Sequence, residues 1–179
     1  MENQTTFAVT FGRFNLPHPG HAHLIARMLE VADKAYVGVS VSKKNNDYET
    51  RRETLHLLCH FAGLDLERIR FFPSSSPFAA VEDFIGLNVA TGLVDPEKQR
   101  QCTVVLGVDQ TALGEKLRDD LGVAFVPNEV RIGSSTVIRY FLERGDEQIV
   151  REIYHDSPAL FDKVLTLRNE ELDRDRKVS

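Results

Sequence analysis

Short runs of consecutive apolar residues alternate along this chain with longer segments in which apolar residues recur every three or four positions. Continuous apolar runs of this length are typical of strands buried on both faces, and the recurring pattern is typical of helices with one buried face. The predicted strands are residues 7–11, 35–41, 68–72, 103–109 and 123–126. The predicted helices are residues 22–32, 51–61, 78–85, 112–121, 137–144 and 147–154, with one more after Ser157-Pro158.

This alternation predicts an α/β fold. Two parallel strands need a crossover between them, and a helix supplies it. We therefore expect a parallel sheet of about five strands with helices on both faces, followed by C-terminal helices. Thr50, with Glu53 three residues further on, predicts a capping box at the start of the second helix. Residues 86–101 are the least regular part of the chain, and we expect a short helix and a loop there.

The length of 179 residues suits one compact domain, which we place at residues 1–167. Residues 168–179 are almost all charged or polar, so we expect a helix end that frays into a disordered tail. The formal net charge of −5 argues against a nucleic-acid partner. No apolar run approaches membrane-spanning length, and the N-terminus has no signal pattern. Cys59 and Cys102 match no metal or redox spacing, so we expect a cytoplasmic protein with no membrane partner.

A segment rich in glycine, proline and histidine lies where the first strand turns into the first helix. The free N–H groups at a helix start attract anions, phosphates above all. Gly12 and Gly20 permit a close approach of the backbone to a ligand, and His18 and His21, three residues apart, can donate to one phosphate oxygen. Two alternatives remain open here. The first is a zinc site, which would need a third and a fourth ligand that the segment lacks. The second is an ordinary strand–turn–helix in which the histidines have no function.

A second candidate phosphate site opens the helix at residues 137–144. Ser134, Ser135 and Thr136 precede it, and three hydroxyl residues at a helix start can cap the helix and donate to phosphate oxygens. Arg139 follows about one turn later, with a planar fork that suits bidentate phosphate binding. The alternative is an ordinary N-cap followed by a surface arginine.

Together these segments resemble a known family. His18-Pro19-Gly20-His21 matches the His-x-Gly-His signature of the nucleotidylyltransferase superfamily, and the longer segment 12–21 is similar to its nicotinamide mononucleotide (NMN) adenylyltransferase branch. The segment 132–139 resembles the second signature of the family, Ile-Ser-Ser-Thr-x-Ile-Arg, with Gly133 as an additional residue. Gly107-Val108-Asp109 resembles a Gly-x-Asp that lies beside nucleotide sugars in that branch.

The resemblance implies a Rossmann-like doubly wound sheet and a direct in-line attack. In that reaction an acceptor phosphate strikes the α-phosphate of a nucleoside triphosphate and displaces pyrophosphate, with Mg²⁺ as cofactor. The implied catalytic residues are His18, His21 and Arg139. The implied nucleotide-binding residues are Gly12, Arg13, Phe14, Gly20, Lys43, Gly107, Asp109, Ile132, Ser134, Ser135 and Thr136. The implied acceptor-binding residues are Arg51 and Arg52, and no protein metal site is expected.

Several of these assignments have plain alternatives. Asp109 either binds ribose hydroxyls or caps the next helix. Lys43 either faces the nucleotide or belongs, with Lys44, to a solvated charge pair. Arg51 and Arg52 either bind the acceptor phosphate or lie on a helix surface.

The preferred hypothesis is an NMN adenylyltransferase that makes NAD and pyrophosphate from NMN and ATP. A sister transferase acting on phosphopantetheine, or on a small phosphorylated alcohol with CTP, is the enzyme alternative. A nucleotide-binding regulatory or structural protein without turnover is the alternative of another class. The chain has no tryptophan, so a ring that stacks on nicotinamide has to come from phenylalanine or tyrosine. The partners implied are ATP and a phosphorylated acceptor, and a homo-oligomer is left open.

Overall fold

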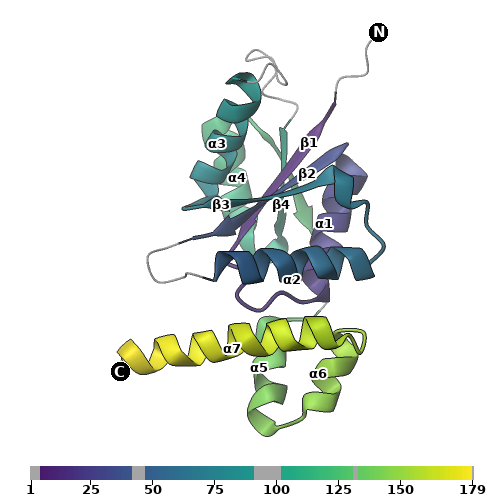
Figure 1. Cartoon of the computed structure of the whole chain (residues 1–179). Helices are drawn as coiled ribbons and strands as arrows, with labels where there is room; N and C mark the ends of the chain where they lie inside the picture. Colours follow the sequence, from purple (N-terminus) through teal and green to yellow (C-terminus); the bar gives the residue numbers. More distant parts are fainter. Residues whose placement is uncertain (1–4, 42–46, 91–101, 131–132, 179) are drawn as a thin grey trace.

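The computed structural model describes residues 5–41, 47–90, 102–130 and 133–178, and it shows a five-stranded sheet between layers of helices (Figure 1). The strand order is β3-β2-β1-β4-β5, and every neighbouring pair is parallel. The strands are β1 Phe7–Gly12, β2 Lys34–Ser40, β3 Ile69–Ser74, β4 Cys102–Gly107 and β5 Ala124–Asn128. The predicted α/β fold, a Rossmann-like parallel sheet of about five strands, is confirmed.

Helices cover both faces of the sheet, as the pattern predicts. They are α1 Pro19–Val31, α2 Tyr48–Phe61, α3 Pro77–Ala90 and α4 Thr111–Leu121, with short 3₁₀ turns η1 Leu66–Arg68 and η3 Val108–Gln110. The alternation of side chains along β1 shows how the two cores form. Ala8 packs with residues of α1 and α2 on one face. Phe7 and Val9 pack with residues of α3 and α4 on the other face.

Three further helices, α5 Ser135–Arg144, α6 Glu147–Ile153 and α7 Pro158–Val178, form a separate layer next to α2 and the start of α1 (Figure 1). Gly145 ends α5 in the left-handed region with φ of 77°, where glycine has no steric penalty. A third core joins this layer to the rest. It contains Leu16 and Leu58 from the Rossmann part and Tyr154 and Phe161 from the C-terminal part, all of them buried.

The predicted frayed tail is wrong for most of its length. Helix α7 continues to Val178, so the predicted domain boundary at residue 167 falls inside it. Its charged side chains find partners on other elements: Arg168 pairs with Glu143, and Arg174 pairs with Asp47. A run of charges predicts a solvated face only when no complementary charge lies opposite it. The sequence does not show which charges lie opposite one another in the fold.

The predicted capping box at Thr50 is also wrong. Helix α2 starts at Tyr48 with Asp47 as its N-cap residue, so Thr50 lies inside the first turns. Glu53 pairs with Lys163 of α7 instead of reaching back to the helix start. Helix α3 reaches Ala90, further than predicted, and residues 91–101 lie outside the described residues. Within the described part of the chain, none of the helices combines the length and the apolar character needed to cross a bilayer.

Candidate active site

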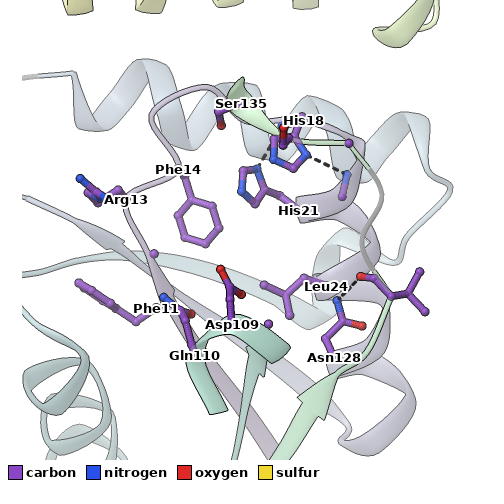
Figure 2. Close-up of a pocket in the computed structure, with 16 residues that line it drawn as sticks. Phe11, Arg13, Phe14, His18, His21, Leu24, Asp109, Gln110, Asn128 and Ser135 are labelled. Carbon is purple, nitrogen blue, oxygen red and sulfur yellow. Dashed lines mark hydrogen bonds between the residues drawn. The ribbon is translucent and has the colours of Figure 1, made fainter. Parts of the chain in front are cut away.

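A pocket of about 320 Å³ opens at the carboxyl ends of β1, β4 and β5 (Figure 2). Parallel strands all end at the same edge of the sheet, and helix starts that follow them gather there. Ten of the residues predicted from the sequence line this pocket: Gly12, Arg13, Phe14, His18, Gly20, His21, Gly107, Asp109, Ser134 and Ser135. Both candidate phosphate segments therefore contribute to a single cavity.

The side chains of His18 and His21 form a capping box at the start of α1. The Gly20 amide donates to Nδ1 of His18 at 3.2 Å, and the His18 amide donates to Nδ1 of His21 at 3.1 Å. A ring nitrogen that accepts from an N–H cannot carry a proton, so the proton of each neutral imidazole is on Nε2. Each Nε2–H is then a donor. A backbone amide of the same turn thus fixes one side of each ring.

Burial keeps His21 neutral. The pKa of His21 lies well below its ordinary value of 6.5, first because burial disfavours the imidazolium and second because His18 lies beside it. The two ring centroids are 3.9 Å apart, so protonating both rings would place two positive charges in contact. At neutral pH His21 therefore acts as a neutral hydrogen-bond donor.

The turn that follows β1 is shaped by Gly12 and Phe14. A Cβ on Gly12 would lie 2.9 Å from the Phe14 ring, closer than real Cβ atoms approach, so a larger residue there would displace the ring. Phe14 has φ of 49°, and its ring meets His21 edge-on at 4.8 Å between centroids. Figure 2 shows this ring beside His21 on the wall of the pocket. The glycine thus lets the phenylalanine support the histidine.

The second segment meets the first at its own helix start. Ser134 is the N-cap of α5 and accepts from the Val137 amide at 3.2 Å, so its hydroxyl proton remains a donor. The Ser135 hydroxyl donates to the Leu16 carbonyl at 3.1 Å and ties α5 to the loop before His18. Gly133, the additional residue, has φ of 72°, and a Cβ on it would lie 3.6 Å from Nδ1 of His18. Thr136 is exposed and does not line the pocket.

Asp109 faces the histidine pair across the pocket from η3 (Figure 2). The N-cap residue of η3 is Gly107 and that of α4 is Gln110, so Asp109 is at neither capping position. This disfavours the helix-cap alternative for Asp109 and leaves its carboxylate on the side of the cavity where a nucleotide sugar is expected.

Three predicted arginines lie outside this pocket. Arg139 is bound to the Glu171 carboxylate of α7 by two hydrogen bonds, through Nε at 2.9 Å and through Nη2, which raise its pKa. Arg52 pairs with Glu49 on the surface of α2, which agrees with the alternative that it is a helix-surface residue.

Arg51 fits neither of the two roles that the sequence predicts for it. Its side chain is 0% exposed, so it is neither a surface residue nor a group that an acceptor phosphate can reach. It pairs with Asp47 and donates to the carbonyls of Ser40, at 2.8 Å, and of Arg13. Its place in sequence, inside an amphipathic helix, gave no sign of this because two of its partners, Ser40 and Arg13, come from other segments. Lys43 and Ile132 lie outside the described residues.

The structure adds lining residues that the sequence analysis missed. They are Phe11, Leu24, Gln110, Asn128 and Val130. Asn128 stands at the carboxyl end of β5 and donates to the Val130 carbonyl at 3.3 Å. A polar residue at the end of a parallel strand is a signal that the sequence analysis could have used, because that edge of the sheet carries the site.

Comparison with known proteins identifies the family. Residues 9–116, more than half of the chain, match the sequence profile of the cytidylyltransferase-like family. The chain belongs to this family. The predicted membership of the nucleotidylyltransferase superfamily, a group of nucleotidyltransferase enzymes, is thereby confirmed. The match includes the His18–His21 segment and Asp109 but ends before the Ser134 segment. The Ser134 segment is therefore assigned to the site by its position in the pocket. No curated protein matches the sequence.

Solved structures share the fold. A bifunctional NMN adenylyltransferase/ADP ribose pyrophosphatase from Francisella tularensis, complexed with AMP and a manganese ion, is 17% identical, with a TM-score of 0.56 over 90% of this chain and 52% of that one. A Vibrio parahaemolyticus protein described as a candidate nicotinate-nucleotide adenylyltransferase is 20% identical, with a TM-score of 0.57 over 88% of this chain and 95% of that one. This chain spans about half the length of the Francisella protein. At such identities the likeness concerns the fold alone.

Proposed function

We propose that this protein transfers AMP from ATP to NMN and releases NAD and pyrophosphate. The observation that carries the proposal is the meeting of two helix starts in one pocket, one bearing His18 and His21 and the other Ser134. Backbone amides at the start of α5, two imidazole donors and a hydroxyl form a set of hydrogen-bond donors that suits a polyphosphate. A pocket with one carboxylate, Asp109, at its other side also suits a ribose.

The reaction needs positioning and charge stabilisation more than a protein nucleophile. An oxygen of the acceptor phosphate forms a bond to the α-phosphorus of ATP, the bond from that phosphorus to the β-phosphate oxygen breaks, and pyrophosphate leaves with the bonding pair. The Nε2–H groups of His18 and His21 are donors for the charge that builds on the α-phosphate. Ser134 and the amides of the α5 start are donors for the departing phosphates.

The metal enters with the substrate. Among the described residues, no group of three or more histidine, cysteine, aspartate or glutamate side chains can hold a metal ion. A divalent ion would therefore be bound chiefly by the phosphates of ATP, and Mg²⁺ is the expected ion because phosphate oxygens and water satisfy it. The Francisella protein was solved with manganese and AMP, which agrees with a divalent ion.

The acceptor assignment rests on the pocket walls and on the neighbours. Phe11 and Phe14 are the aromatic side chains that the pocket offers to a flat ring, in a chain without tryptophan. Arg51 and Arg52 do not line the pocket, so the acceptor phosphate would have to be held by other groups. The described solved neighbours act on NMN or nicotinate nucleotide by name, which supports a pyridine nucleotide as acceptor.

Pyrophosphate release from ATP and from CTP, measured against NMN, nicotinate mononucleotide, phosphopantetheine and phosphorylated alcohols, tests the proposal. We expect turnover with ATP and NMN. His21→Ala should lower kcat by about 100- to 1,000-fold with little change in KM for ATP, since it removes a donor that acts mainly in the transition state. His60→Ala removes an exposed histidine of α2 and serves as the control. A folded His21→Ala protein that keeps more than about a third of wild-type turnover contradicts the assignment.

The same panel separates the alternatives. Turnover with CTP and a phosphorylated alcohol, or with phosphopantetheine, identifies a sister transferase. Nucleotide binding without pyrophosphate release for any acceptor identifies a binding protein that lacks turnover.

A further inference from the structure

The loop between β1 and α1 has its backbone carbonyls bound by distant parts of the chain. The Arg13 carbonyl accepts from Arg51 of α2, and the Leu16 carbonyl accepts from Ser135 of α5 at 3.1 Å. The Pro17 carbonyl accepts from the Tyr154 hydroxyl at 2.6 Å. Carbonyls in a loop of this kind ordinarily bind water and leave the loop free to move. Here side chains replace that water, so the loop enters α1 along a fixed path.

Tyr154, like Arg51, is a fully buried donor. It is 0% exposed at the C-terminal end of α6, and its ring packs in the core that joins the C-terminal helices to Leu16 and Leu58. Burial raises the pKa of Tyr154 far above its ordinary value of 10.0, so its hydroxyl keeps its proton and stays a donor. The bond reaches the peptide unit that immediately precedes His18.

The peptide between Pro17 and His18 sets the orientation of the His21 ring. The carbonyl of Pro17 and the amide of His18 belong to one rigid plane, and the His18 amide is the donor that fixes Nδ1 of His21 at 3.1 Å. Holding the carbonyl therefore holds the amide, and the amide sets the orientation of the His21 ring. The chain of contacts runs from the Tyr154 hydroxyl through one peptide plane to the imidazole.

We propose that Tyr154 is a positioning residue for the His18–His21 pair, so that α6 sets the geometry at the α-phosphate without touching the substrate. The kinetic form of this inference rests on the proposed nucleotidyl transfer. Its structural form, that the hydroxyl orients the imidazoles, does not depend on it.

Tyr154→Phe is the test, because it removes the hydroxyl and leaves the ring in the core. Misplacing a catalytic group by about 1 Å can cost on the order of 100-fold in rate, so we expect kcat to fall between about 10- and 100-fold with KM for ATP within about two-fold of wild type. Tyr140→Phe, at an exposed tyrosine of α5, is the matched control and should keep the wild-type kcat. A Tyr154→Phe protein that melts at a lower temperature but keeps the wild-type kcat would show a role in stability only and overturn the proposal.

A second measurement works without turnover. Long-range ¹H–¹⁵N spectra report which nitrogen of each imidazole carries the proton and the pH at which each ring titrates. In the wild type we expect Nδ1 of both rings to be unprotonated at pH 7.5, and in Tyr154→Phe we expect His21 to titrate at a higher pH, closer to the ordinary 6.5. If His21 titrates alike in Tyr154→Phe and Tyr140→Phe, the hydroxyl does not orient the ring and the proposal fails. If no acceptor supports turnover while these spectra differ as expected, the proposed function fails and the positioning role stands.

Discussion

At the scale of single residues, the site depends on side chains that bind one another before they bind a ligand. His18 and His21 each use Nδ1 to accept from a backbone amide of the same turn. This fixes both rings and both tautomers in the absence of substrate, which is the kind of preorganisation that lowers the cost of stabilising charge in a transition state. The residue type alone does not provide it, since a histidine at an open turn would rotate freely.

Burial of a neutral histidine also makes stability depend on pH. In the unfolded chain His21 binds a proton near its ordinary pKa of 6.5, whereas in the folded protein burial and His18 keep its pKa well below that value. Between the two pKa values the unfolded chain binds more protons, so the free energy of unfolding decreases as the pH falls below about 6.5. We expect urea unfolding at pH 7.5 and at pH 5 to show this loss in the wild type and a smaller loss in His21→Ala.

The control for this experiment is His60→Ala, which removes an exposed histidine and should keep the wild-type pH dependence. Equal pH dependence in the wild type and His21→Ala would mean that the folded protein does not keep His21 neutral.

At the scale of elements, α7 connects α5 to the start of α2. Its Glu171 accepts from Arg139 of α5 and from Arg168, and its Arg174 donates to Asp47, the N-cap of α2, at 2.9 Å. Burial alone would raise the pKa of Glu171, but the hydrogen bonds from the two arginines outweigh it and lower the pKa. The carboxylate is therefore charged at neutral pH and binds two cations at once.

Removing that charge should destabilise the protein. Hydrogen bonds to charged groups contribute about 1.5–3 kcal/mol, so Glu171→Gln should lower the free energy of unfolding by about that amount. Asp173→Asn changes an exposed carboxylate of the same helix, paired only loosely with Arg176, and should change stability by less than about 0.5 kcal/mol. Urea unfolding measures both, and a Glu171→Gln protein as stable as Asp173→Asn would contradict the role of the network.

Kinetics of the same network test the proposed phosphate role of Arg139. To reach a triphosphate, the guanidinium has to leave Glu171. If it does so, Arg139→Ala should raise KM for ATP by about 10-fold or more while Glu171→Gln does not raise it. Equal KM values in the two variants would restrict Arg139 to joining α5 to α7.

At the scale of the whole molecule, the sheet brings together segments that are far apart in the chain. His18 lies at the start of α1, and Ser134 lies at the start of α5, with β2 to β5 and α2 to α4 between them in the chain. Both reach the same 320 Å³ pocket because parallel strands end at one edge. A shared ligand should therefore couple the two segments energetically.

Thermal unfolding with ATP measures this coupling. A ligand present at about 100 times its Kd stabilises the folded state by about 2.7 kcal/mol, so ATP should raise the Tm of the wild type. We expect His18→Ala and Ser134→Ala each to reduce this ATP-dependent increase, since each loses a donor to the same phosphate chain, whereas His60→Ala keeps it. The increase, not the Tm itself, is compared, because His18 and Ser134 also cap helices. An increase lost in one of the two variants and intact in the other would show that the segments do not share a ligand.

The sequence by itself determined the parts of this protein that are local. The five strands follow from apolar runs, and α1 and α5 follow from periodic patterns, with hydroxyl residues that predict a cap at the start of α5. Each of these features is encoded within a few residues, so one segment suffices to predict it. The family resemblance needed two such segments, His18–His21 and Ile132–Arg139. The carboxyl edge of the sheet as the place of the site follows as well, because all helix starts in a parallel sheet face the same way.

Only the tertiary structure decided which long-range partner each polar side chain has. Arg51 is predicted as a surface or ligand-binding residue, but it is buried, and besides Asp47 of its own helix start it binds the carbonyls of Ser40 and Arg13 in other segments. Arg139 is bound to Glu171, and Tyr154 is bound to Pro17. A charged or hydroxyl side chain gains stability from whichever complementary group lies within about 3 Å, and that group is set by how remote elements pack rather than by neighbours in the chain. For the same reason α7 stays helical where its composition predicts a frayed tail: its charges are matched across space, and no local pattern records the match.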